Sequence, residues 1–339
     1  MNLGIGIVGS GAIAKVHASC VEAQSNAHIA GILTRTKDNA KSLVEKFNAE
    51  VFTDPVTFYS QTALHAVCIC NESGLHGKSI LQAMEAKKHI LCEKPLETTL
   101  TKIDSIIDKL NGQKVTLGVV FQNRMNPNYI EFKKTIQSGK LGEILLVNTQ
   151  VNWYRDDNYY KSNNWRGTIA LDGGAALINQ SIHTLDLLID LMGAISSVGA
   201  QVETKTHDIE GEDLAVAHLT FQNGALGTLS AGTCLYPGYQ ESITVYGTKG
   251  NMVFEGGLIR SCSLPDWKPT ANLQNNQSSG SAKLNSIELH QAVIDDFIKS
   301  VLEDKEPLVN AKEARKSVAL IEAIYKASEK KQIIKLELS

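Results

Sequence analysis

The stretch Gly9-Ser10-Gly11-Ala12-Ile13-Ala14 follows a short apolar run, Gly4–Val8, and leads directly into a predicted helix over residues 11–23. It has the form G-x-G-x-x-A and stands between a strand and a helix, as a dinucleotide-binding turn does. The first glycine permits the tight turn, the second lets a pyrophosphate approach the backbone, and the small third residue allows close helix–strand packing. We therefore expect a nicotinamide dinucleotide to bind at Gly9, Ser10, Gly11, Ala12 and Ile13.

Apolar strand-like runs alternate with amphipathic helical patterns through the rest of the first third of the chain. The second strand is predicted at His28–Leu33, and the later ones at Ala66–Cys70, His89–Cys92 and Val115–Val120. Near-continuous apolar strands separated by helices predict a parallel sheet that is covered on both faces.

The pattern changes after Phe121. A long helix is predicted at Gly174–Met192, and several strand-like runs punctuated by Gly, Asn or Pro then follow in succession up to Cys262. Consecutive strands with short turns predict a large, mostly antiparallel sheet. A mobile loop is predicted at Lys268–Ser286, and two helices at Ile287–Glu303 and Ala311–Lys330. We expect an α/β protein with a Rossmann dinucleotide-binding domain at 1–122 and a substrate-binding and oligomerisation domain at 123–339.

Composition supports this class and excludes others. The 339 residues include 33 Lys and Arg against 36 Asp and Glu, a formal charge of −3 that gives no electrostatic footprint for nucleic acid. Apolar runs such as Ala66–Cys70 are far shorter than the ~20 residues that span a bilayer, and the N-terminus does not resemble a signal peptide. Six cysteines are too few for a disulfide scaffold, so we expect reduced thiols, a cytoplasmic location and no metal site at Cys68-x-Cys70.

The end of the second strand bears on the choice of cofactor. NAD binders place an acidic residue there against the ribose hydroxyls, whereas this chain has Leu33-Thr34-Arg35-Thr36 and no carboxylate until Asp38. The guanidinium of Arg35 suits a 2′-phosphate. With Thr34 and Arg35 as cofactor-binding residues, the sequence favours NADP and leaves NAD possible; in the alternative, Arg35 is simply a solvated loop residue.

Three further motifs carry a family resemblance over essentially the whole chain. They are Glu93-Lys94-Pro95, Arg124-Met125-Asn126-Pro127, and the stretch from Gly173-Gly174 through Asn179-Gln180 to His183 and Asp186. Together with the glycine turn, they resemble the glucose–fructose oxidoreductase / inositol dehydrogenase / rhizopine-catabolism (Gfo/Idh/MocA) family. The resemblance implies hydride transfer at a carbinol carbon of a sugar, cyclitol or nucleotide-sugar. It also implies a homodimer or homotetramer formed through the C-terminal sheet.

Hydride removal from a secondary alcohol also requires removal of the hydroxyl proton. The catalytic candidates are Lys94, which follows a buried strand at the sheet's carboxyl edge, and His183, expected to share a helix face with Asn179. Many relatives have an aspartate at the position of Asn179. An amide cannot accept a proton in this way, so Asn179 is expected to bind and orient substrate. The Asn-Gln…His variant is similar to that of relatives acting on nucleotide-linked sugars.

The remaining candidates follow from the same resemblance and from residue chemistry. Tyr154 and Arg166 are expected to bind substrate. Asp186 is expected to be a supporting carboxylate, and His17 and His76 to cap or pack helices. Glu72 departs from the family pattern, since relatives usually have Thr-Pro where this chain has Asn71-Glu72. The further cofactor-binding candidates are Asn71, Ser73, Glu93, Lys94, Arg124, Trp165 and Arg166.

Two other functions remain open from the sequence. Some members of the family resemble glycosidases that oxidise transiently and reduce again with a retained cofactor. A non-enzymatic cofactor-sensing protein is the other alternative, but such a protein would be free to lose Lys94 and His183, both of which are present.

Overall fold

The computed structural model describes residues 2–268 and 287–336, and the chain divides into two compact units. The first unit comprises the chain through Gln122 together with helix α9 (Ile287–Glu303) and the residues up to Arg315; the second comprises the remainder. The two units are therefore not separated by a single boundary after residue 122. Helix α9 belongs to the first unit because it packs on α1 (Ala12–Glu22), where Gln291 Nε2 donates to the Cys20 carbonyl at 3.2 Å.

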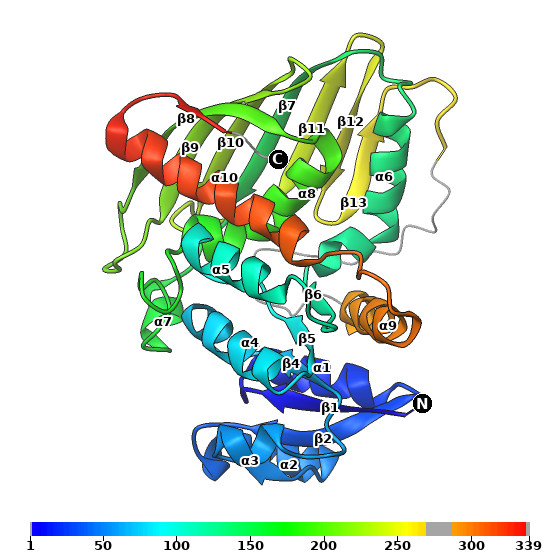
Figure 1. Ribbon diagram of the computed structural model, residues 1–339. Helices are drawn as coiled ribbons and strands as arrows, with labels where there is room; N and C mark the ends of the chain where they lie inside the picture. The colour runs from blue at the N-terminus through cyan, green and yellow to red at the C-terminus, as the bar shows by residue number, and fades with distance from the viewer. Residues whose placement is uncertain (1, 269–286, 337–339) are drawn as a thin grey trace. The chain divides into compact units, whose positions relative to one another are not determined.

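The first unit is built on a wholly parallel six-stranded sheet of order β3-β2-β1-β4-β5-β6 (Figure 1). The parallel sheet and the dinucleotide-binding class of fold were predicted from the alternating strand and helix patterns and the glycine turn. The order reverses between β1 and β4, so the carboxyl ends of these two strands flank the crevice where such sheets bind ligands. The strands are β1 (Leu3–Val8), β2 (Ala27–Leu33), β3 (Val51–Phe52), β4 (Ala66–Ile69), β5 (His89–Cys92) and β6 (Leu117–Val119).

Every residue of β1 and β4 is buried, which requires cover on both faces of the sheet. The covering helices, besides α1 and α9, are α2 (Lys41–Phe47), α3 (Pro55–Tyr59), α4 (His76–Glu85) and α5 (Leu100–Leu110). The two-residue β3 and five-residue α3 are too short to leave a periodic pattern in the sequence. Helix α3 is instead fixed locally, by the Asp54 side chain capping its first turn and by Pro55 at its first position.

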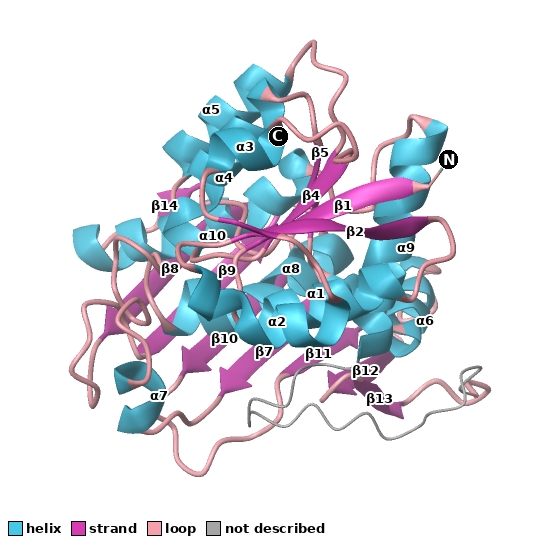
Figure 2. Cartoon of the chain, turned by 90° about the horizontal axis from the view of Figure 1, so that it is seen from below, coloured by secondary structure: helices cyan, strands magenta, loops and turns pink. Residues whose placement is uncertain are grey.

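The second unit carries an eight-stranded sheet of order β13-β12-β11-β7-β10-β9-β8-β14 (Figure 2). Its pairs are antiparallel except for β10 with β7, which agrees with the mostly antiparallel sheet expected. The strands are β7 (Ile144–Asn152), β8 (Ile195–Glu203), β9 (Leu214–Phe221), β10 (Leu226–Gly232), β11 (Ser242–Gly247), β12 (Gly250–Glu255), β13 (Leu258–Cys262) and β14 (Ile334–Lys335).

One face of this sheet is packed and the other is open. Buried and exposed residues alternate along β9 and β10, and the buried set faces helices of the same unit. These helices include α6 (Pro127–Gln137), α8 (Ile182–Met192) and α10 (Ala311–Lys330); α7 (Asp157–Lys161) is a short helix beyond the end of β7. The predicted loop lies, except for Lys268, outside the described residues. Among the described helices, none has the length and apolar character needed to cross a membrane.

Candidate functional site

The glycine turn after β1 has the geometry that a pyrophosphate requires. Gly9 has φ +107°, and a Cβ there would come within 2.8 Å of the Cys70 carbonyl oxygen, so only glycine fits. Gly11 caps α1 without a side-chain hydrogen bond, and a Cβ built on it meets no atom within 4 Å. The first N–H groups of α1 are therefore approachable by an anion, in the position expected for a bound dinucleotide.

Two side-chain pairs organise the end of β2. The hydroxyls of Ser10 and Thr34 lie 3.1 Å apart, and Arg35 Nη2 lies 2.8 Å from Glu72 Oε1. The side chain of Arg35 is 78% exposed and that of Glu72 only 15%. The departure from the family pattern at Glu72 thus provides Arg35 with a counter-charge, a relationship that sequence spacing does not reveal.

The loops that follow β4 and β5 are joined through His76, the first residue of α4. Its ring Nδ1 lies 2.7 Å from the Pro95 carbonyl and its Nε2 lies 3.1 Å from the Asn71 carbonyl. Asn71 also donates to Ser79 Oγ at 3.0 Å, which leaves its buried Oδ1 without a hydrogen-bond partner, and Ser73 is buried nearby at the start of a 3-10 turn. His76 therefore ties the predicted cofactor loop to the segment that carries Lys94.

Glu93 is part of a buried polar cluster and supports Lys94. Its Oε1 lies 2.7 Å from His17 Nε2, while its Oε2 accepts the backbone N–H of Lys94 at 3.2 Å. Burial by itself raises the pKa of Glu93, but the hydrogen bond to His17 and the charges of His17, His290 and Lys94 lower it to about 2. Since both carboxylate oxygens have partners inside the fold, Glu93 positions the backbone of Lys94. Its direct contact with a cofactor stays a prediction.

In the second unit, the glycine-led stretch is held by a carboxylate that the sequence analysis missed. Glu212 accepts the N–H groups of Leu177 at 2.6 Å and Ala175 at 3.3 Å, and the hydroxyl of Tyr325 at 2.9 Å. Gly174 has φ +143°, and a Cβ there would lie 2.4 Å from the Tyr325 oxygen. Burial raises the pKa of Glu212. Gly174 is therefore needed where the chain passes over the buried Glu212–Tyr325 pair.

The predicted helix over 174–192 is not continuous. Residues Ala176–Ser181 form a π-helical segment that carries Asn179, and α8 then begins at Ile182 and carries His183. Segments with π-helical hydrogen bonding occur frequently at functional sites, because the wider turn re-aims its side chains. The spacing rule for an α-helix, used to place Asn179 and His183 on one face, does not apply across this junction.

Asn179 belongs to a chain of side-chain hydrogen bonds. Its Nδ2 donates to Asp172 Oδ1, and its Oδ1 accepts from Gln180 Nε2 at 2.8 Å. Gln180 also donates to the Tyr159 hydroxyl at 2.7 Å and accepts from Arg155 Nη2 at 2.8 Å. The amide of Asn179 is thus held in a fixed orientation. Asp172, only 2% exposed, is a second residue that the sequence analysis missed, although it directly precedes the glycine pair.

Arg124 forms buried ion pairs with two aspartates of α8. Its Nε and Nη2 donate to the two oxygens of Asp186, at 2.8 and 2.7 Å, and its Nη1 donates to Asp190 at 3.2 Å. Arg124 is 6% exposed and Asp186 1% exposed. That Arg124 also contacts a cofactor stays a prediction. For Asp186, these contacts give the supporting role that was expected.

Tyr154, Trp165 and Arg166 lie in the second unit. Tyr154 is 39% exposed and makes an edge contact with Tyr236, with ring centroids 5.2 Å apart. The guanidinium carbon of Arg166 lies 4.2 Å from the Tyr159 ring centroid and 5.9 Å from that of Trp165. Arg166 also donates to the Tyr159 carbonyl and to Ser162 Oγ, both at 3.0 Å. An aromatic and cationic cluster therefore stands beside Asn179 and Gln180.

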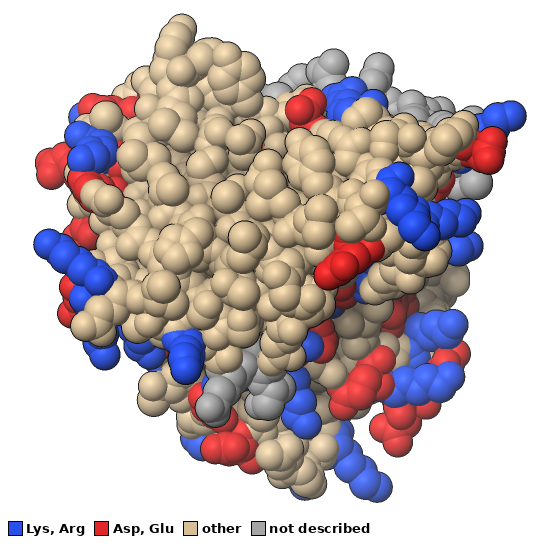
Figure 3. Space-filling view, turned by 90° about the horizontal axis from the view of Figure 1, so that it is seen from above, with Lys and Arg blue, Asp and Glu red and all other residues tan. Residues whose placement is uncertain are grey.

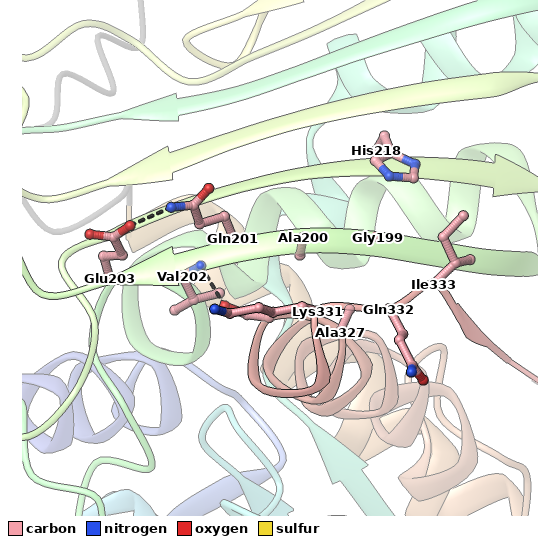
Figure 4. Close-up of a pocket in the computed structure, with 11 residues that line it drawn as sticks. Gly199, Ala200, Gln201, Val202, Glu203, His218, Ala327, Lys331, Gln332 and Ile333 are labelled. Atoms are coloured by element: carbon pink, nitrogen blue, oxygen red, sulfur yellow. Dashed lines mark hydrogen bonds between the residues drawn. The ribbon is translucent and has the colours of Figure 1, made fainter.

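A cavity of about 710 Å³ in the second unit lies elsewhere (Figure 4). It is lined by residues of β8, by His218 of β9 and by the end of α10 with the residues that follow it. None of the predicted site residues lines it. Within the described part of the chain, no group of three or more His, Cys, Asp or Glu is placed to hold a metal ion.

Comparisons with known proteins agree with both units. A family model described as the NAD-binding Rossmann fold of an oxidoreductase family (GFO_IDH_MocA) matches residues 3–121, and one for that family's C-terminal alpha/beta domain matches residues 133–337. The myo-inositol 2-dehydrogenase of Thermotoga maritima is 25% identical over 98% of each chain.

Two solved structures have similar folds over the whole chain. The WlbA dehydrogenase from Bordetella pertussis, in complex with NADH and UDP-GlcNAcA, is 29% identical with a TM-score of 0.90 and covers 100% of both chains. The WlbA dehydrogenase from Chromobacterium violaceum, with the same two ligands, is 28% identical with a TM-score of 0.89, over 100% of this chain and 97% of the other.

Proposed function

The chain belongs to the Gfo/Idh/MocA oxidoreductase family, and from that premise we propose that it transfers a hydride between a nicotinamide dinucleotide and a carbinol carbon of a carbohydrate-like substrate. The substrate is a sugar, a cyclitol or a nucleotide-sugar. The observation that carries the proposal is the glycine turn with an open first turn of α1, in a chain that also holds Lys94 and His183. NADH in similar structures supports the same chemistry.

In the oxidation direction, the substrate's C–H bond breaks and its electron pair leaves as hydride, while the hydroxyl loses its proton and becomes a carbonyl. The bound cofactor supplies the hydride acceptor. Lys94 and His183 carry the proton, and the reverse reaction returns it to the alkoxide oxygen. Glu93 and His76 hold the segment around Lys94, and the fixed amide of Asn179 orients a substrate hydroxyl or carbonyl.

For the cofactor, we propose NADP as the preferred form, with NAD also accepted. Arg35 is exposed at the end of β2 and keeps donors for a 2′-phosphate. The Glu72 carboxylate at 2.8 Å offsets part of this attraction, because it adds a negative charge close to where the phosphate would bind. The preference for NADP is therefore modest.

For the assembly, we propose that the open face of the eight-stranded sheet binds a second copy of this chain. Strand register places uncharged side chains side by side across this face, and Figure 3 shows a broad surface with few charged groups. Val216 and Leu226 are more than half exposed. Depletion of charged residues is typical of the core of a protein–protein interface. The row across the sheet consists of His218, Thr228, Asn148, Thr244, Val253 and Ser261.

The central test replaces the two proton-transferring residues. Lys94→Met should remove most of kcat while dinucleotide binding is largely kept, and His183→Asn should lower kcat by ~10²–10⁴-fold. Turnover is followed by nicotinamide absorbance over a panel of sugars, cyclitols and nucleotide-sugars. An active Lys94→Met enzyme on its best substrate would refute the assignment.

The same assay distinguishes a dehydrogenase from the alternative, a glycosidase that retains its cofactor. A dehydrogenase changes the nicotinamide absorbance in proportion to product, whereas a glycosidase that re-reduces its intermediate releases sugar without net cofactor turnover.

The six cysteines are free, which supports a reaction in the reducing cytoplasm.

A further inference from the structure

Arg155 is a buried cation whose hydrogen-bond partners are neutral. It is 9% exposed, and its Nη2 and Nη1 donate to Gln180 Oε1 at 2.8 Å and to the Tyr154 carbonyl at 3.3 Å. Its Nε is buried without a hydrogen-bond partner. Among residues 2–268 and 287–336, which the structure describes, no carboxylate forms an ion pair with it. A buried charge in such surroundings is costly unless an anion joins it.

A second guanidinium lies on the same tyrosine ring. The Cζ atoms of Arg155 and Arg166 lie 5.2 and 4.2 Å from the centroid of Tyr159. The Nε of Arg166 is also buried without a partner. Burial lowers the pKa of Arg155, and the like charge of Arg166 acts in the same direction. Two guanidinium groups at one ring repel each other, and an anion between them would remove that cost.

Aromatic contacts offset only part of the free-energy cost of burying Arg155 close to Arg166. Arg155 also lies over the Trp153 ring, with its Cζ 5.1 Å from the centroid. Cation–π contacts of this kind stabilise a buried arginine less than a charged hydrogen-bond partner does. They keep the guanidinium groups in place without neutralising them. The unpartnered Nε donors remain available to an acceptor.

The arginines are also connected to the proposed substrate residue. Gln180 accepts from Arg155 and donates both to Asn179 at 2.8 Å and to the Tyr159 hydroxyl at 2.7 Å. Any change in the guanidinium of Arg155 is therefore transmitted through one side chain to the amide of Asn179. The cationic cluster and the substrate-orienting residue form one continuous hydrogen-bonded group within the second unit.

We propose that Arg155, assisted by Arg166, binds an anionic group of the substrate, so that the substrate is an acidic sugar carrying a carboxylate or a phosphate. The inference rests on the proposed function, because it takes Asn179 to orient the same molecule. The planar fork of a guanidinium matches either anion with two parallel hydrogen bonds, and the buried Nε donor supplies one of them. Neutral sugars and cyclitols leave the cluster uncompensated and bind weakly.

The test measures binding to the cofactor-loaded protein by isothermal titration, with glucuronate, UDP and glucose as separate probes. The wild-type protein should bind glucuronate or UDP, and Arg155→Met should weaken that binding by about 10–100-fold. Arg155→Lys should recover part of it, since an ammonium keeps the charge but not the fork. The matched control is Arg260→Met, which removes an exposed arginine of the same unit and should leave all affinities unchanged.

The outcomes are distinguishable. A loss confined to glucuronate identifies a carboxylate, and a loss confined to UDP identifies a phosphate. The inference is overturned if the wild-type protein binds neither probe, or if Arg155→Met binds them as well as Arg260→Met does. If Arg155→Met is unfolded by circular dichroism, Arg166→Met and Arg155→Lys carry the same comparison. Anion binding that depends on Arg155, without turnover of any sugar, cyclitol or nucleotide-sugar, would refute the proposed function and leave this site standing, whereas turnover of neutral substrates alone would overturn the inference.

Discussion

Glu72 holds the guanidinium of Arg35 through a contact of 2.8 Å between the loop after β4 and the end of β2. The carboxylate is largely covered, whereas the guanidinium is mostly in solvent. The pair places one positive and one negative group where the adenosine ribose of a dinucleotide lies in this fold. Cofactor preference then depends on the balance between these two charges.

Removing the charge of Arg35 and removing the charge of Glu72 should shift the preference between NADP and NAD in opposite directions. Arg35→Ala should lower NADP affinity more than NAD affinity, by about tenfold, which corresponds to about 1.4 kcal/mol. Glu72→Gln should raise NADP affinity several-fold, because it keeps a hydrogen-bonding side chain and removes the repulsion of the 2′-phosphate. Fluorescence titration with both cofactors measures this, with the exposed Glu50→Gln as control. Equal losses for both cofactors in Arg35→Ala would refute the assignment.

The two glycines of the turn should respond differently to substitution. Gly11→Leu adds a side chain where a Cβ meets no atom within 4 Å, so the fold should be kept while the pyrophosphate is blocked. Gly9→Ala should lower the melting temperature instead, because its φ of +107° and the nearby Cys70 carbonyl exclude a Cβ. Thermal denaturation and cofactor titration of both variants separate the effects. A Gly11→Leu protein with unchanged cofactor affinity would contradict the location of the site.

Strong periodicity made most of the fold predictable. Helices α9 and α10 were predicted at the bounds that the structure has, since their apolar residues recur at helical spacing over many turns. The two-residue β3 has no such pattern. The π-helical segment at Ala176–Ser181 was also missed, because tertiary hydrogen bonds from Leu177 and Ala175 to Glu212 accompany it, and no local propensity specifies them.

Residues of the site that lie inside motifs were easier to predict than their partners. Lys94 and Asn179 stand in recognisable patterns, but Asp172 and Glu212 are ordinary acidic residues in sequence. Their roles depend on which side chains the fold brings next to them. The same limitation applies to Arg124, whose motif gave no sign that its guanidinium binds Asp186 and Asp190.

Acid should destabilise the protein partly through Glu93. Its pKa is lowered from 4.5 to about 2 in the folded protein, so the ionised group stabilises the fold above pH 4.5 and loses that effect as the pH falls from about 4.5 through 2. Urea denaturation from pH 6 to pH 2 should show a steeper loss of unfolding free energy for wild type than for Glu93→Gln. Glu93→Gln should itself cost about 2 kcal/mol at pH 7. The exposed Glu85→Gln is the control, and parallel curves for wild type and Glu93→Gln would contradict this.

A charge on the open sheet face should weaken self-association. Thr228 lies in the uncharged row on β10, where its hydroxyl donates to Asn148 at 2.9 Å. Thr228→Lys would bury an ammonium in the proposed interface, so the assembly should dissociate at least tenfold more readily. Light scattering after size exclusion at several concentrations measures this. Thr101→Lys, the same change on an exposed position of α5, should have no effect; a wild-type protein that is monomeric throughout would reject the interface.

The hydrogen bond between Asn179 and Asp172 allows us to predict the effect of an aspartate at position 179, where many relatives have one. Asn179→Asp would place two carboxylates against each other within a buried chain, so one of them would have a raised pKa and the substrate-orienting donor would be lost. We expect kcat/KM to fall by at least tenfold, with no new productive ionisation in the pH–rate profile. The double variant Asp172→Asn/Asn179→Asp reverses the pair and restores one amide–carboxylate hydrogen bond, so it should recover part of the loss. Asp172→Asn alone is the matched control, since it removes the charge but leaves Asn179 in place. A faster Asn179→Asp enzyme would mean that position 179 needs a base, and the proton work would then have to be divided differently between Lys94 and His183.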